Sequence, residues 1–158
     1  MINDNKQFIF ELQDFLSTDS YFLFKTKGRL LGIDYGSVRI GLALSDKERQ
    51  IATPFKTIFK LKELDDIVPA KEITGFVVGL PLQTDGQEGF IAEQVRLFCR
   101  RLAEKYQLPI LLTDERYTSK YATEAMTGRG IRLKRQKEVL DAEAAARILQ
   151  KALNILSK

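Results

Sequence analysis

The stretch from Leu30 to Asp46 constrains the fold of this chain more than any other. It reads LLGIDYGSVRIGLALSD, which predicts two apolar strands, over 30–34 and 38–45, joined by a tight turn. Gly36 lies in that turn and can supply the positive φ that tight turns often need. The stretch therefore predicts a buried pair of neighbouring strands.

Asp34 places a carboxylate at the end of the first of these strands. A bare carboxylate against a packed sheet costs several kcal/mol unless something pairs with it. A bound cation, or a metal linked to a phosphate, would meet that need. Alternatively, Asp34 makes only a local turn through its own backbone. This segment by itself leaves both interpretations open.

The remaining pattern predicts a mixed α/β sheet of five strands with helices on both faces. The three further strands are expected near 52–60, 76–80 and 109–113, and the helices at 61–73, 90–106, 118–127 and 139–156. Residues 29–158 form the main domain in this interpretation. Residues 1–28 form an aromatic-rich N-terminal extension. Its Phe8, Leu12, Phe15 and Leu16 fall at helical spacing, so we expect a short helix that docks on the domain or mediates self-association.

Composition removes several classes of active site. The 158 residues include no histidine and one cysteine, Cys99. Ser-His-Asp and Cys-His pairs, histidine or thiolate zinc sites and an intrachain disulfide are therefore excluded. Acids, bases and metal ligands must come from Asp, Glu, Lys, Tyr or the backbone, and carboxylates favour Mg²⁺ or Mn²⁺.

Composition also predicts where the protein works. The hydrophobic share of 44% and charged share of 29% are typical of a soluble globular protein. No segment approaches the roughly 20 apolar residues of a membrane span, and the N-terminus has no secretory signal pattern. We expect a cytoplasmic protein without a membrane partner.

Three acids occur at comparable places in the predicted fold. Asp34 ends one strand, Glu115 follows the strand at 109–113, and Asp141 opens the last helix. Because ligands collect at the carboxyl ends of strands in open α/β sheets, these acids could share one crevice. The small Ala142, Ala145 and Ala146 would let the last helix pack close to the sheet. Acids brought together repel one another unless cations bind, and two divalent ions are a common solution in nucleases.

Each acid also has a purely structural interpretation. Asp141 could be an ordinary first-turn residue favoured by the helix dipole, and Glu115 could pair with Arg116 or a nearby lysine. For Asp114 we favour the structural interpretation, a residue that leads into a helix or lies in a turn.

A basic stretch precedes Asp141. Residues 128–137 hold five basic residues and no acid: Arg129, Arg132, Lys134, Arg135 and Lys137. A phosphate backbone bound there would lie beside the proposed metal ligands, and a solvated loop is the equal alternative.

Four motifs in order resemble the YqgF/RuvX family. They are Gly32-Ile33-Asp34-Tyr35-Gly36-Ser37, Gly79-Leu80-Pro81-Leu82 with Asp85-Gly86, Asp114-Glu115-Arg116, and Asp141 with Ala144-Ala145. The resemblance covers residues 30 to about 156. Gln83 stands where the family often has Asn, and residues 1–28 extend beyond the usual start.

The resemblance implies a ribonuclease-H-like fold, related to that of the Holliday-junction resolvase RuvC. It implies Asp34, Glu115 and Asp141 as catalytic residues that coordinate one or two Mg²⁺ or Mn²⁺ ions. The implied activity is metal-dependent phosphodiester hydrolysis, most often 5′-end maturation of pre-16S rRNA, and Holliday-junction resolution is the older suggestion. Implied partners are pre-rRNA or branched DNA, ribosomal precursor particles, and a second copy of the chain if it is a dimer rather than a monomer.

Arg39, Arg116 and the basic stretch would hold the phosphate backbone. Two other classes remain. A nucleotide-binding module related to actin and sugar kinases would need a second Asp-x-Gly-Ser/Thr hairpin, which the chain lacks. A non-catalytic nucleic-acid-binding protein would use the acids as caps and turns.

Overall fold

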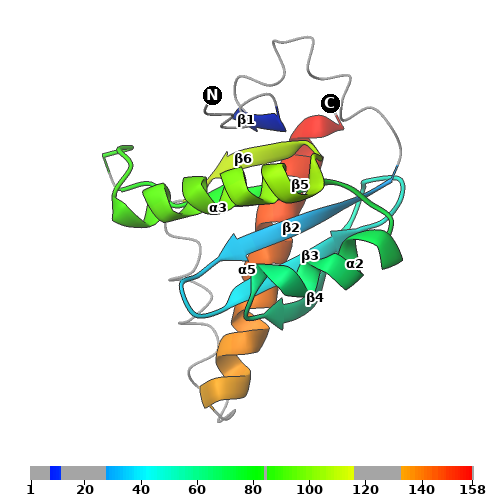
Figure 1. The fold of residues 1–158 in the computed structure, drawn as a ribbon, viewed down its shortest axis with the longest axis horizontal. Helices are drawn as coiled ribbons and strands as arrows, with labels where there is room; N and C mark the ends of the chain where they lie inside the picture. The colour runs from blue at the N-terminus through cyan, green and yellow to red at the C-terminus, as the bar shows by residue number, and fades with distance from the viewer. Residues whose placement is uncertain (1–7, 12–27, 84, 116–132, 158) are drawn as a thin grey trace.

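A computed structural model of the chain describes residues 8–11, 28–83, 85–115 and 133–157. These residues form one mixed sheet with helices packed on both of its faces (Figure 1). The sheet has six strands in the order β1-β6-β5-β2-β3-β4. Their bounds are Ile9–Glu11 (β1), Arg29–Tyr35 (β2), Ile40–Ser45 (β3), Ala52–Ile58 (β4), Ile73–Leu80 (β5) and Ile110–Asp114 (β6).

The direction of the strands places three carboxyl ends at one edge of the sheet. β2, β3 and β4 form an antiparallel meander, while β5 runs parallel to β2 and β6 parallel to β5. The ends of β2, β5 and β6 therefore lie side by side. In an open α/β sheet this edge is where ligands bind.

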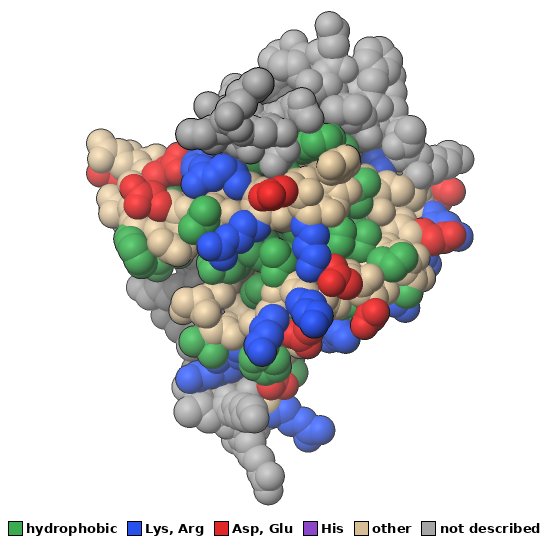
Figure 2. All heavy atoms as spheres, in the orientation of Figure 1, with side chains coloured by type: hydrophobic (Ala, Val, Ile, Leu, Met, Phe, Trp, Pro, Cys, Tyr) green, Lys and Arg blue, Asp and Glu red, His purple; other side chains and the backbone are tan. Residues whose placement is uncertain are grey.

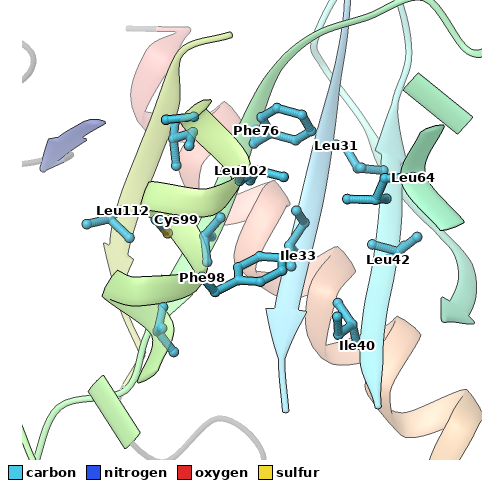
Figure 3. Close-up of a cluster of buried hydrophobic side chains, with 14 of the residues drawn as sticks. Leu31, Ile33, Ile40, Leu42, Leu64, Phe76, Phe98, Cys99, Leu102 and Leu112 are labelled. Atoms are coloured by element: carbon cyan, nitrogen blue, oxygen red, sulfur yellow. The ribbon is translucent and has the colours of Figure 1, made fainter. Parts of the chain in front are cut away.

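The helices cover the two faces unequally. The short helix η3 (Leu61–Glu63), α2 (Leu64–Ala70) and α3 (Phe90–Tyr106) lie on one face, and α5 (Leu133–Leu156) crosses the other (Figure 1). Alternate strand residues supply the two cores. Leu31, Ile33 and Phe76 pack beneath α2 and α3 (Figure 3), whereas Leu30 and Val77 pack against α5.

Glycines on the strands let α5 lie very close to the sheet. A Cβ at Gly32 would be 2.7 Å from the Cβ of Leu149, and one at Gly41 would collide with the backbone carbonyl of Asp141. On the helix side, Ala142 and Ala145 are buried, as expected from their size. Small residues on both partners therefore fix where α5 crosses.

The predicted α/β class with helices on both faces is confirmed. The expected five strands are confirmed with shifted ends, and the prediction missed a sixth, β1. Ile9–Glu11 form this strand rather than part of a short helix, because they pair in parallel with β6. Leu12, Phe15 and Leu16, and the helix predicted at 118–127, lie outside the described residues.

Two predicted helices differ in extent. The helix expected at 61–73 is shorter and begins with a 3-10 turn. The last helix begins at Leu133, six residues before the predicted start at 139. No helix in the described part of the chain is long and apolar enough to cross a membrane.

Candidate active site

Asp34 lies on the face of the sheet that α5 covers. Along β2, Leu31 and Ile33 face α2 and α3, so Leu30, Gly32 and Asp34 alternate to the other face. In the β2–β3 ladder Asp34 stands opposite Gly41. Because the backbone of Asp141 packs directly on Gly41, the structure brings Asp141 next to Asp34.

Glu115 reaches the same place from β6 by passing over β5. It follows Thr113 at the spacing of two that keeps strand side chains on one face. Thr113 is paired with Gly79 of β5, and a Cβ at Gly79 would lie 2.7 Å from the Cγ of Glu115. The missing side chain of Gly79 thus leaves room for Glu115 to lie over β5, toward β2.

Asp114 does not join this group. It is exposed and alternates to the opposite face of β6. Asp114 is the last residue of strand β6, paired with Leu80, so its interpretation as a helix-approach or turn residue is wrong. Of the two neighbouring acids only Glu115 is directed toward Asp34.

The pKa of Asp34 reflects both its burial and the two acids near it. The pKa of Asp34 is raised to about 7, first by burial and then by the charges of Asp141 and Glu115. Burial disfavours the ionised form, and two nearby carboxylates add repulsion. Within the described residues Asp34 has no ion-pair partner. A cation bound there would relieve this cost.

Arg39 pairs with Asp141 in this structure. Its Nε donates to the Oδ2 of Asp141 at 2.8 Å, and both side chains are partly buried. Sequence reasoning assigned Arg39 to a phosphate contact and did not foresee this pair. Because α5 begins at Leu133, Asp141 lies in its third turn. The interpretation of Asp141 as a first-turn residue is therefore wrong.

Glu115 is held by two side chains that the sequence analysis did not name. Thr113 donates its hydroxyl to the Oε1 of Glu115 at 3.0 Å. Lys151 of α5 places its Nζ 3.9 Å from the same oxygen and donates to the backbone oxygen of Asp114 at 2.6 Å. The expected lysine partner is thus Lys151, while Arg116 lies outside the described residues. Strand alternation could have revealed Thr113, but no local signal marks Lys151.

The donor set suits a hard divalent cation. Three carboxylates supply oxygen ligands, which Mg²⁺ and Mn²⁺ prefer. Among the described residues, no three acidic or cysteine side chains stand close enough together to form a complete metal site. In this arrangement the carboxylate of Asp141 is paired with Arg39. Metal binding at all three acids would require that ion pair to rearrange.

The predicted nucleic-acid-binding residues are only partly described. Arg116, Arg129 and Arg132 lie outside the described residues. Lys134, Arg135 and Lys137 lie on α5 instead of in a loop, so the expectation of a loop is wrong for them. Arg135 and Lys137 are exposed, and basic side chains are visible at this end of α5 in the lower part of Figure 2.

Comparison with known proteins gives a consistent match. A family profile described as "RuvX: Holliday junction resolvase" matches residues 28–155. A protein of Paramagnetospirillum magneticum named "Putative pre-16S rRNA nuclease" is 43% identical over 132 residues, which cover 80% of this chain and 85% of that protein. A protein of Rhodobacter capsulatus with the same name is 42% identical over 136 residues, which cover 82% of this chain and 86% of that protein.

A solved structure, "T. thermophilus RuvC in complex with Holliday junction substrate", aligns with 80% of this chain and 93% of its own. The TM-score is 0.48 at 13% sequence identity.

Proposed function

We propose that this chain, which belongs to the RuvX family, is a nuclease that hydrolyses phosphodiester bonds in precursor 16S rRNA. The observation that carries the proposal is the convergence of Asp34, Glu115 and Asp141 at one edge of the sheet, where burial first, and then the charges of Asp141 and Glu115, raise the pKa of Asp34 to about 7. Two relatives about 40% identical over most of the chain carry the name of that nuclease.

Asp34, Glu115 and Asp141 are the proposed catalytic residues and metal ligands. A bound Mg²⁺ or Mn²⁺ would supply activation of a water molecule and stabilisation of the leaving oxygen. Asp34 is close enough to both other acids for their charges to raise its pKa. A pKa of about 7 leaves a large share of Asp34 ionised at neutral pH, and a cation would increase that share.

Three basic residues would balance the charge of the acids and bind the substrate. Arg39 neutralises Asp141 in the absence of metal, which lowers the repulsion that Asp34 experiences. The exposed Arg135 and Lys137 at the start of α5 would hold phosphates of the substrate. They lie on the same helix as Asp141, so a bound backbone would be directed toward the acids.

A second candidate activity is cleavage of four-way DNA junctions. The description of the matching family profile favours it. The same three acids would serve, because the proposed chemistry is phosphodiester hydrolysis in both cases. The two activities differ only in the nucleic acid that the protein selects.

The decisive experiment is a cleavage assay on a labelled panel of substrates. The panel holds a precursor 16S rRNA 5′ leader, linear RNA, linear duplex DNA and a four-way junction, each with Mn²⁺, Mg²⁺ or EDTA. Asp34→Asn is assayed in parallel, and Asp114→Asn serves as a matched control, because Asp114 is exposed on the other face of β6. We expect metal-dependent cleavage of the rRNA leader that is lost in Asp34→Asn and retained in Asp114→Asn.

Two results would contradict the proposal. Preferred cleavage of the junction would identify the second activity. Salt-sensitive binding without cleavage of any substrate, unchanged by Asp34→Asn, would identify a non-catalytic nucleic-acid-binding protein.

A further inference from the structure

We propose that Thr113 is a positioning residue that holds Glu115 over Gly79 in the orientation required for metal binding. This inference rests on the proposed function, in which Glu115 is a metal ligand. It assigns to a buried hydroxyl a role that neither the family match nor the names of the relatives contain.

The side chain of Glu115 must span an unusually long distance to reach Asp34. Its strand, β6, is separated from β2 by β5, so the two strands lie roughly 9–10 Å apart at the usual spacing. The carboxylate must lean across the sheet to meet Asp34. The Cγ of Glu115 occupies the space where a side chain at Gly79 would begin, which shows that it does lean across β5.

A glutamate side chain does not keep such an orientation without contacts. It has several rotatable bonds, and fixing them costs on the order of 1–2 kcal/mol of conformational entropy. Glu115 follows the last residue of β6, and its backbone N–H still donates to the carbonyl of Leu80 at 3.0 Å, but that bond restrains the backbone and not the side-chain torsions. Something must therefore hold the carboxylate in place.

Thr113 provides that restraint. It is 1% exposed, and its hydroxyl donates to the Oε1 of Glu115 at 3.0 Å. Thr113 lies within the ladder, paired with Gly79, and its β-branched side chain has few accessible rotamers. The donor is therefore fixed before any ligand arrives. A buried hydroxyl between Leu111 and Glu115 has no role in the apolar packing, which is better served by valine.

Lys151 holds the backbone at Asp114, between Thr113 and Glu115. Its Nζ donates to the carbonyl of Asp114 at 2.6 Å, which links the end of β6 to α5. Ile148, one turn earlier on α5, packs where a side chain at Gly79 would extend. The space available to Glu115 is thus bounded by the sheet on one side and by α5 on the other.

The test compares two pairs of proteins, and the two members of each pair differ by the hydroxyl group at position 113. The pairs are the wild type with Thr113→Val, and Thr113→Ser with Thr113→Ala. Thr113→Val replaces the hydroxyl with a methyl group at nearly constant volume. Thr113→Ser and Thr113→Ala both lack the methyl group, and only serine keeps the donor. Thr74→Val is the control, because Thr74 lies at the opposite end of β5 and its hydroxyl donates to the carbonyl of Arg29. Mn²⁺ affinity is measured by isothermal titration calorimetry on the full chain, with folding checked by circular dichroism.

We expect Thr113→Val and Thr113→Ala to bind Mn²⁺ about 10-fold more weakly, the usual lower limit for removing a group that orients a metal ligand. Thr113→Ser and Thr74→Val should bind like the wild type. With the rRNA leader, Thr113→Val should lower kcat and leave KM unchanged, because Thr113 is buried away from substrate. If Thr113→Val does not fold, the serine and alanine variants still isolate the hydroxyl.

The outcomes separate this inference from the proposed function. Unchanged Mn²⁺ affinity in the folded valine and alanine variants would overturn the positioning role and leave the nuclease proposal intact. A serine variant as weak as the alanine variant would also overturn it. Absence of Mn²⁺ binding by the wild type would instead overturn the metal-dependent function, and this inference with it.

Discussion

At the scale of single residues, Asp34 bears the largest electrostatic cost at the proposed site. It is largely buried, and the charges of Asp141 and Glu115 add to the effect of burial on its pKa. Arg39 compensates Asp141 and Lys151 lies near Glu115. Asp34 has no ion-pair partner within the described residues, so it is the acid whose charge most depends on a bound cation.

This cost predicts a pH dependence of stability in the absence of metal. The pKa of Asp34 is raised from 3.8 to about 7, so the folded protein binds this proton more tightly than the unfolded chain does. The resulting stabilisation is fully present below pH 3.8 and is lost as the pH rises through 7. Asp34→Asn cannot ionise, so its free energy of unfolding should exceed that of the wild type at pH 8 by on the order of 4 kcal/mol. The difference should disappear near pH 4.

Urea unfolding in EDTA at pH 4, 6 and 8 measures this difference. Asp46→Asn provides a control of opposite sign, because backbone N–H groups of Ile51 and Gln50 lower the pKa of Asp46. Asp46 therefore stabilises the fold above its unfolded pKa, and this contribution is lost as the pH falls. If the free energies of unfolding of the wild type and Asp34→Asn changed in parallel with pH, the burial of Asp34 beside two acids would be contradicted.

At the scale of elements, the crossing of α5 over β3 and β2 creates the site. Gly41 and Gly32 receive the backbone of α5, and Asp141 sits where the helix passes Gly41. At the other edge of the sheet, β1 is linked to α3 by Arg96, which pairs with both Glu11 and Glu88. This strand lies outside residues 28–155, the region that the family profile matches.

Gly41→Ala tests the helix crossing. The added Cβ would collide with the carbonyl of Asp141, so α5 must move away from the sheet. We expect a loss of about 1–3 kcal/mol in the free energy of unfolding and reduced nuclease activity, because Asp141 moves with the helix. Thr53→Ala on neighbouring β4, whose side chain is exposed, should change neither. Wild-type stability in Gly41→Ala would show that the helix does not lie this close.

At the scale of the whole molecule, the face covered by α2 and α3 carries charge of both signs (Figure 2). Acidic and basic side chains are interspersed over α2 and α3, and the formal charge of the chain is only +4. Binding of nucleic acid should therefore depend on a local group of basic residues. The described candidates are Arg135 and Lys137, which are exposed on α5.

The double variant Arg135→Gln, Lys137→Gln tests this surface. If each residue contacts one phosphate, the slope of log Kobs against log salt should become shallower by about 2. The matched control is Lys47→Gln with Lys71→Gln, which lie beyond the end of β3 and before the start of β5, at the edge opposite Asp34. Fluorescence anisotropy with labelled RNA at several salt concentrations gives both slopes. Equal slopes for the two double variants would exclude α5 as the phosphate-binding surface.

The sequence by itself determined most of the secondary structure, and it proposed the three acids that the fold brings to one edge of the sheet. Alternating and continuous apolar runs mark β2 to β6, because burial of a strand depends on a local period of two. The helix at 90–106 was predicted with its observed bounds for the same reason, at the period of a helix. The start of α5 was missed, because Leu133 is the only apolar residue of its first turn and the basic and polar residues after it give no helical apolar pattern.

Only the tertiary structure decided which groups meet. The Arg39–Asp141 pair, the lysine at Glu115 and the strand β1 each join segments far apart in the chain. Local propensity carries no information on such contacts, because they follow from where α5 and β6 pack. Gly79 is the clearest example of a residue whose role the sequence could not predict. Its lack of a side chain matters only because Glu115, which follows the neighbouring strand β6, lies across it.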